Sequence, residues 1–180
     1  MPDLYAIAAD LSAERADGPL PVENWHPERV ADMDLVIKAD GTWIHEGRPI
    51  ARPALVRLFS RILRRDEDGF ALVTPAEKLR IAVEDAPFLV VDHERQDDGY
   101  RFRTNVGDVV TAGRDHPITV RDSRTLGAAV PYLRVRGGLE ARISRNVYYR
   151  LVEDAETGED GALFIESGKE RFVLGHPHDA

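Results

Sequence analysis

Cysteine is absent from the 180 residues, which excludes disulfide bonds, thiolate nucleophiles and cysteine-ligated zinc. Long apolar runs are absent as well, because no stretch approaches the roughly 20 apolar residues of a membrane-spanning helix. The first 16 residues have neither the basic start nor the unbroken apolar run of a signal peptide. We therefore expect a cytoplasmic protein that does not contact a membrane.

Signatures of catalysis and metal binding are also missing. The sequence has no Gly-x-Ser-x-Gly nucleophile elbow, no phosphate-binding loop ending in Lys-Ser or Lys-Thr, and no dinucleotide fingerprint. The six histidines are scattered, and none has the spacing of metal ligands. The sequence therefore predicts no catalytic residues, no metal and no cofactor, and an enzyme is the less favoured class.

The chain lacks net positive charge, since its formal charge at pH 7 is −8. Proteins that bind nucleic acids or membrane surfaces are usually basic, so we expect neither partner. Arginine is nevertheless concentrated locally: residues 48–65 hold six arginines and no acid, and residues 121–150 hold seven against two acids. Two interpretations stay open, a solvated helix face with Arg57, Arg61, Arg64 and Arg65, or a positive field for an anionic small molecule.

What is present is the composition of a globular protein, 43% hydrophobic and 31% charged, with glycine turns that mark two hairpins. Asp40-Gly41 separates two apolar strands within residues 35–45, and Gly137-Gly138 does so within residues 132–143. Glycine favours such tight turns because it readily adopts positive φ. The sequence therefore predicts an antiparallel hairpin at each place.

Apolar residues at helical spacing predict three helices. The first covers residues 4–11. The second opens at Pro53, which suits a first helical turn, and is expected to end near residues 66–69. Ser144 can cap the third helix, which extends to Val152. Several short apolar segments predict strands, whereas residues 121–129 are expected to form a connecting loop.

Two parts of the chain match each other at an offset of about 90 residues. Ile50 aligns with Leu139, and Leu58 aligns with Val147 at the same offset of 89. Two strands predicted after each helix also match, and loop insertions account for the small drift in offset. The sequence thus predicts a strand-rich α+β fold made of duplicated hairpin–helix–strand–strand units. We expect an N-terminal helix and connector over 1–18, a first repeat over 19–95 and a second over 96–180.

A seam between two related units is a favoured place for a ligand, and polar turns are expected beside it. Lys78 can meet an anion, Asn105 can offer a donor and an acceptor to the edge of a base, and Arg136 can grip a phosphate. Each also has a structural alternative, as a turn residue or a salt-bridge partner. The predicted ligand-binding residues are Trp43, Thr74, Glu77, Lys78, Asp85, Phe88, Thr104, Asn105, His116, Arg134 and Arg136.

Taken in order, several motifs between Pro19 and Gly175 are similar to those of a bacterial family known as domain of unknown function 1285. They are Asn24-Trp25-x-Pro27, Asp32-Met33, Asp40-Gly41-x-Trp43-x-x-x-Gly47-x-Pro49-Ile50, Thr74-Pro75-x-Glu77-Lys78, Glu84-Asp85-Ala86-Pro87-Phe88, Thr104-Asn105, His116-Pro117, Pro131-Tyr132-x-x-Val135-Arg136 and Leu139-x-Ala141. The acidic insertion 153–160 departs from the pattern. The resemblance implies a duplicated core, a C-terminal half like a pleckstrin-homology roll, and a groove between halves for a nucleotide-like ligand with a signalling role.

The leading hypothesis is a ligand-binding or signalling protein that holds a nucleotide-like anion between its halves. Lys78 and Arg136 would pair with the phosphate and Asn105 with a polar edge, while Trp43 or Phe88 would supply an apolar wall. Local arginine excess in an acidic chain motivates this assignment.

Two other classes remain open. A protein-interaction module could use a strand edge or the Tyr148-Tyr149 region, since one of these rings must face away from the buried stripe of its helix. The least favoured class is a hydrolase that uses Glu84 or Asp85 with His116, because no nucleophile or metal ligand set supports it.

Overall fold

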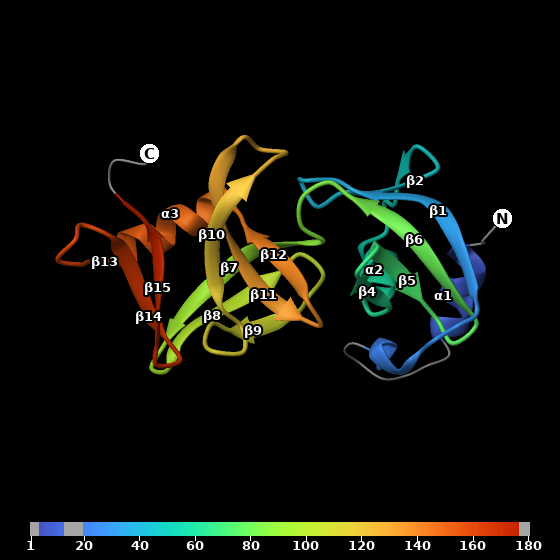
Figure 1. The fold of residues 1–180 in the computed structure, drawn as a ribbon, viewed down its shortest axis with the longest axis horizontal. Coiled ribbons are helices and arrows are strands. Elements are labelled where there is room, and N and C mark those ends of the chain that lie inside the picture. The colour runs from blue at the N-terminus through green and yellow to red at the C-terminus, as the bar shows by residue number, and fades with distance from the viewer. Residues whose placement is uncertain (1–3, 13–19, 177–180) are drawn as a thin grey trace. The chain divides into compact units, whose positions relative to one another are not determined.

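The computed structural model describes residues 4–12 and 20–176, so part of the segment predicted over 1–18 lies outside the described residues. The chain divides into two compact units, Met1–Glu84 and Asp85–Ala180, each with a six-stranded sheet (Figure 1). Among the described residues, no helix has both the length and the apolar character needed to cross a membrane.

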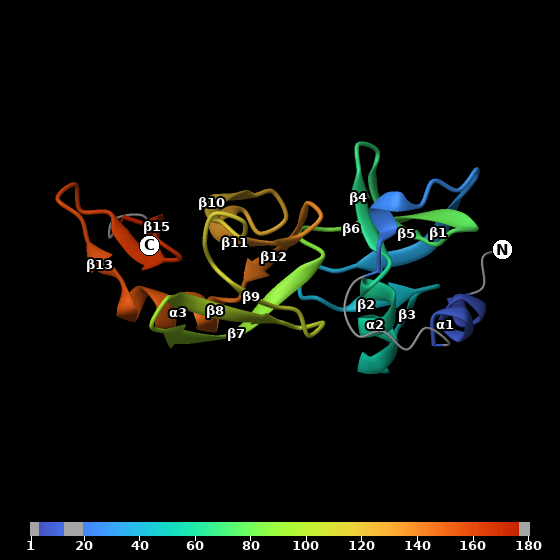
Figure 2. The ribbon, with the colours of Figure 1, turned by 90° about the horizontal axis from the view of Figure 1, so that it is seen from below.

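The N-terminal unit is a sheet with its two α-helices on one side. Its elements are α1 (Leu4–Ser12), the 3-10 helix η1 (Val22–Asn24), β1 (Arg29–Ile37), β2 (Trp43–His45), β3 (Arg48–Pro49), α2 (Pro53–Ser60), β4 (Leu63–Asp66), β5 (Gly69–Val73) and β6 (Glu77–Val83). The strand order is β3-β2-β1-β6-β5-β4, with β1 and β6 parallel and the other neighbours antiparallel. Figure 2 shows α1 and α2 on the same side of β4 and β5. The fully buried Phe59 of α2 contributes to the core there.

The turn between β1 and β2 confirms the first predicted hairpin. Gly41 has a φ of 86°, and the Asp40 carboxylate accepts a hydrogen bond from the Thr42 backbone N–H at 2.9 Å. This local chemistry fixes the register, so that Ile37 lies opposite Trp43. Both side chains are at most 1% exposed and belong to the core.

The second helix ends at Ser60, earlier than the sequence predicts. After a short turn the chain returns as β4, antiparallel to β5, with Leu63 opposite Leu72. Helical spacing in a short apolar run does not distinguish a helix from a buried strand, which is why β4 is missed. As a consequence, Arg64 lies on a strand and not on a solvated helix face, and it is only 8% exposed.

The C-terminal unit contains a second sheet that curves into a half-barrel, followed by a helix and a small third sheet (Figure 1). Its elements are β7 (Phe88–Gln96), β8 (Gly99–Thr104), β9 (Val109–Thr111), β10 (Ile118–Ser123), β11 (Ala128–Arg136), β12 (Leu139–Ile143), α3 (Arg145–Asp154), β13 (Glu156–Thr157), β14 (Leu163–Ser167) and β15 (Glu170–Gly175). Gly137 and Gly138 both have positive φ in the turn between β11 and β12, which confirms the second predicted hairpin. The expected loop over 121–129 is shorter, because β10 and β11 occupy its two ends.

The small sheet of β13, β14 and β15 is attached to the half-barrel by specific polar contacts. Ser167 Oγ accepts a hydrogen bond from the Tyr100 backbone N–H at 2.8 Å and donates one to the Ala112 carbonyl at 2.7 Å. On α3, the Tyr148 hydroxyl donates to the Leu174 carbonyl at 3.0 Å, whereas Tyr149 is 56% exposed. One of the two tyrosines therefore faces away from the body of the protein, as predicted.

The two large sheets share one strand order, which confirms the predicted duplication. In each, the first and sixth strands are parallel neighbours at the centre, and an antiparallel meander extends on either side. In the fold, β1–β6 are therefore equivalent to β7–β12. The sequence alignment instead makes residues 43–50 equivalent to 132–139 and α2 equivalent to α3, so its register differs from that of the fold. No helix stands between β9 and β10 where α2 stands between β3 and β4.

Candidate functional site

Six of the eleven predicted ligand-binding residues lie at one end of the C-terminal sheet. β7 begins there at Phe88, and the antiparallel β8 ends beside it at Thr104. β11 ends at the same edge, with Arg136 opposite Leu139, and β10 begins next to the last residues of β11. We call this end, formed by Phe88, Thr104, Asn105, His116, Arg134 and Arg136, the Phe88 end.

Arg136 is held in place from two sides. Its Nε lies 3.2 Å from Asp108 Oδ1, and both side chains are 18% exposed. Its guanidinium carbon lies 5.2 Å from the ring centre of Phe88, a cation–π arrangement. Phe88 itself is fully buried, so it supports the guanidinium group and offers no exposed apolar wall.

Asn105 and Thr104 organise the turn that follows β8. Asn105 Oδ1 accepts a hydrogen bond from the Leu89 backbone N–H at 2.9 Å. Thr104 Oγ1 accepts one from the Asp108 backbone N–H at 3.1 Å, and the Thr104 N–H donates to the Asp108 carbonyl at 2.9 Å. The turn therefore fixes both Asn105 and the carboxylate that binds Arg136.

His116, in the loop before β10, lies close to Arg134 on β11. His116 Nδ1 is 3.1 Å from the Arg134 carbonyl, and because a carbonyl can only accept, Nδ1 carries the proton. Arg134 is exposed and has no ion pair with any residue that the structure describes. A register shift separates Arg134 from Arg136 in the pairing with β12, so the two guanidinium groups have different surroundings.

Asp85 forms a separate polar cluster in the same unit. Its Oδ1 accepts hydrogen bonds from Ser123 Oγ at 2.6 Å and from the Tyr132 hydroxyl at 2.7 Å, and Arg142 Nε lies 3.4 Å from Oδ2. Burial, followed by the contact with Asp85, raises the pKa of Tyr132. Arg121 stacks on the Tyr132 ring at 3.6 Å. With its side chain only 6% exposed, Asp85 ties the start of this unit to β10, β11 and β12.

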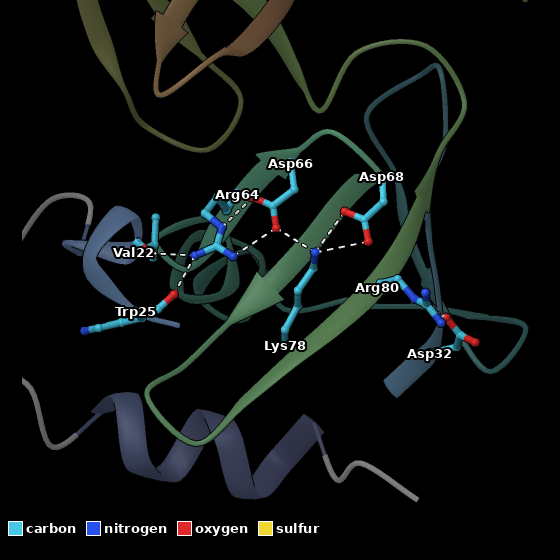
Figure 3. Close-up of polar contacts among 8 residues, drawn as sticks. All are labelled: Val22, Trp25, Asp32, Arg64, Asp66, Asp68, Lys78 and Arg80. Atoms are coloured by element: carbon cyan, nitrogen blue, oxygen red, sulfur yellow. Dashed lines mark hydrogen bonds and ion pairs between the residues drawn. The ribbon is translucent and has the colours of Figure 1, made fainter. Parts of the chain in front are cut away.

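Lys78 belongs to a third group, in the N-terminal unit (Figure 3). Its Nζ lies 2.7 Å from Asp66 and 2.8 Å from Asp68, and these two carboxylates raise the pKa of the ammonium group. Asp66 also receives two hydrogen bonds from Arg64. The sequence predicts an anion beside Lys78, but carboxylates of the protein already take that place.

The hollow beside Lys78 does not favour an anion either. Its volume is about 600 Å³, and four carboxylates line it against two arginines, one lysine and one histidine. The lining residues are Glu23, His26, Arg64, Arg65, Asp66, Glu67, Asp68 and Lys78. An added phosphate would have to displace Asp68, the more exposed of the two carboxylates on Lys78.

The remaining predicted residues of the N-terminal unit belong to its turns or to its core. Thr74 Oγ1 accepts hydrogen bonds from the backbone N–H groups of Ala76 and Glu77 in the β5–β6 turn, and Glu77 lies 3.4 Å from Arg29. Trp43 is 1% exposed, and its Nε1 has no hydrogen-bond partner among the described residues. These positions support the turn and the core of their unit.

The residues named for a hydrolase engage different partners. Glu84 accepts hydrogen bonds from Lys38 and from the Ala39 backbone N–H. Asp85 accepts hydrogen bonds from Ser123 and Tyr132. His116 donates to a backbone carbonyl. No carboxylate–histidine hydrogen bond joins these three residues in the described part of the chain.

Sequence reasoning missed two residues that matter for these groups. The sequence assigns no role to Asp108, yet its carboxylate orients Arg136. The sequence places Arg64 on a helix, either in a solvated face or in a positive field, yet it lies on β4 and donates to the carbonyls of Val22 and Trp25. The partners of Asp108 and Arg64 lie 28 to 42 positions away in the chain, and local sequence patterns do not predict contacts over such separations.

Comparison with known proteins places both units in one family. The model described as "Domain of unknown function (DUF1285), N-terminal domain" matches residues 20–86, and that described as "Protein of unknown function (DUF1285), C-terminal domain" matches residues 87–174. The search of curated proteins gives no match.

Solved structures agree with this assignment. A DUF1285 family protein from Silicibacter pomeroyi DSS-3 is 44% identical, with a TM-score of 0.86 and 96% of each chain covered. A DUF1285 family protein from Shewanella baltica OS155 is 30% identical, with a TM-score of 0.56, and the match covers 68% of this chain and 92% of that chain. The chain therefore belongs to the DUF1285 family.

Proposed function

We propose that the protein binds a small anionic, nucleotide-like ligand at the Phe88 end of its C-terminal sheet. The observation that carries this proposal is the presence of two arginines there, of which Arg136 is oriented by Asp108 and Arg134 is exposed. Arg134 is exposed and has no ion pair with a described residue, so its guanidinium group is available to a phosphate. Arg136 is already ordered by Asp108 and Phe88, which reduces the entropy lost on binding.

Calorimetric titration and thermal-shift measurements with AMP, GMP and ATP test the proposal. A ligand present at 100 times its Kd stabilises the folded protein by about 2.7 kcal/mol, a readily measured shift. We expect Arg134→Ala and Arg136→Ala to weaken binding about tenfold or more, because a charge-assisted hydrogen bond contributes ~1.5–3 kcal/mol.

Arg124→Ala is the matched control for these variants. Arg124 is also exposed, but it lies in the turn that follows β10, at the opposite end of that strand from His116. We expect its removal to leave nucleotide binding unchanged. The proposal is wrong if no nucleotide stabilises the protein, or if Arg134→Ala and Arg136→Ala bind as the wild type does.

We also propose that the C-terminal unit resembles a pleckstrin-homology roll and has a role in signalling. The half-barrel of β7–β12 supports it, since such rolls also curve a sheet around one core. Superposition of residues 85–176 on solved pleckstrin-homology domains checks the likeness. A match confined to one hairpin would contradict it.

Protein interaction is a second candidate function, favoured by one exposed aromatic ring. Tyr149 is 56% exposed on α3, and its ring centre lies 6.3 Å from that of the anchored Tyr148. An exposed tyrosine on a rigid helix is typical of interaction surfaces. We expect Tyr149→Ser to reduce the recovery of a partner in pull-down experiments, and a strictly monomeric protein without partners would count against this function.

A further inference from the structure

The side-chain amide of Asn105 is fixed in one orientation by the strand beside it. The Leu89 backbone N–H donates to Asn105 Oδ1 at 2.9 Å, and the Asn105 N–H donates to the Leu89 carbonyl at 2.8 Å. Because a backbone N–H can only donate, the amide atom that meets it must be the oxygen. The Nδ2 group makes no hydrogen bond with the residues that the structure describes.

The turn that carries Asn105 also contacts Arg136, through Asp108. The paired contacts of Thr104 with Asp108 close this turn, and Asp108 then binds Arg136 Nε at 3.2 Å. Asn105 is exposed within the turn. Its Nδ2 is therefore a donor held at the Phe88 end together with the two arginines.

We propose that Asn105 Nδ2 donates to the phosphate group of the ligand, so that Asn105 selects a phosphate monoester and does not read a base. This inference rests on the proposed function and narrows its ligand class. An asparagine that recognises a base edge uses both its amide oxygen and its amide nitrogen. Asn105 Oδ1 is occupied by Leu89, and the donor that remains matches phosphate oxygens, which are strong acceptors.

Asn105→Asp tests this role with little change in shape. One carboxylate oxygen can still accept the hydrogen bond from Leu89, whereas the other replaces the Nδ2 donor with a charged acceptor. With ribose 5-phosphate as the probe, we expect the Kd to rise at least about tenfold, the equivalent of one charge-assisted hydrogen bond.

Asn146→Asp is the matched control. It makes the same chemical change and adds the same charge on the exposed first turn of α3. We expect this variant to keep the wild-type Kd for ribose 5-phosphate. A comparable loss of affinity in both variants would show an effect of net charge alone and overturn the role of Asn105.

The wild-type protein supplies a second test that needs no variant. AMP and ribose 5-phosphate are expected to bind with similar Kd, and adenosine, which has no phosphate, is expected not to bind. If Asn105→Asp binds ribose 5-phosphate like the wild type while Arg134→Ala binds it weakly, only the proposed role of Asn105 is wrong. If no phosphate ester binds, or if adenosine binds as tightly as AMP, the proposed anion site is wrong as well.

Discussion

Arg64 connects the segment before β1 to the edge of the N-terminal sheet. Its guanidinium group donates to the carbonyls of Val22 at 2.9 Å and Trp25 at 2.7 Å, and to both carboxylate oxygens of Asp66 (Figure 3). A planar fork of donors satisfies these four oxygen atoms at once, which the single ammonium group of a lysine does not. Arg64 is therefore a structural residue whose guanidinium group is occupied by contacts within the protein.

We expect Arg64→Ala to lower the free energy of unfolding by about 3–5 kcal/mol, the usual cost of removing one partner of a buried ion pair. The variant leaves the carbonyls of Val22 and Trp25 without this donor, and Asp66 keeps its contact with Lys78. Urea unfolding measures the loss, and Arg65→Ala is the control. Arg65 is the exposed next residue, whose cation–π contact with Phe70 at 5.6 Å contributes only about 0.5–1 kcal/mol. Equal losses in the two variants would contradict this account.

The same residue makes a pH-dependent contribution through Asp66. Arg64, and after it Lys78, lowers the pKa of the Asp66 carboxyl in the folded protein. A carboxyl with a lowered folded pKa stabilises the fold above its unfolded pKa, near 3.8, and loses that contribution as pH falls through the folded pKa. The difference in stability between wild type and Arg64→Ala is therefore expected to shrink below about pH 4.

At the scale of elements, the contact between the β7–β8 turn and the β14–β15 turn requires a glycine. A Cβ placed on Gly99 would lie 2.2 Å from Ser167 Oγ and 2.8 Å from Ser167 Cα. Gly99 also has a φ of 139°, which side-chain-bearing residues rarely adopt. We expect Gly99→Ala to weaken the attachment of the small sheet, because the new methyl group must displace the Ser167 backbone.

Gly69→Ala separates this clash from backbone strain. Gly69 has a similar φ of 122°, but a Cβ there would meet nothing within 4 Å. We expect Gly69→Ala to cost about 1–3 kcal/mol through strain, and Gly99→Ala to cost roughly another 1–3 kcal/mol through overpacking. Urea unfolding measures both, and faster hydrogen exchange at the Tyr100 amide locates the second effect. Equal costs would show that the contact with Ser167 is unimportant.

The sequence predicts elements where local chemistry decides the structure. Asp40-Gly41 and Gly137-Gly138 mark the two hairpins because positive φ is a property of the turn itself. β4 escapes prediction because a short apolar run at helical spacing fits a helix as well as a buried strand. The register of the repeat escapes prediction because the pairing of β1 with β6 joins residues far apart in the chain. The same holds for the site: polar turns could be recognised, but the contact of Asn105 with Leu89 follows only from the pairing of β7 with β8.

At the scale of the whole molecule, the shared strand order gives each unit a complete sheet. In the C-terminal unit β7 is the central strand, paired in parallel with β12 and antiparallel with β8. The Phe88 end depends on this strand, because Phe88 begins it and Leu89 orients Asn105. The proposed site therefore requires β7 to remain with the rest of its unit.

We expect a fragment of residues 85–180 to fold alone, because both sheets and α3 of the C-terminal unit lie within it. A fragment of residues 96–180, cut at the boundary that the sequence predicts, loses nearly all of β7 and leaves β8 and β12 without their shared neighbour. Its unpaired backbone donors and acceptors then have no partner strand. Amide dispersion in NMR spectra and cooperative urea unfolding should identify the first fragment as folded and the second as unfolded. Equally folded fragments would show that the unit does not need its central strand.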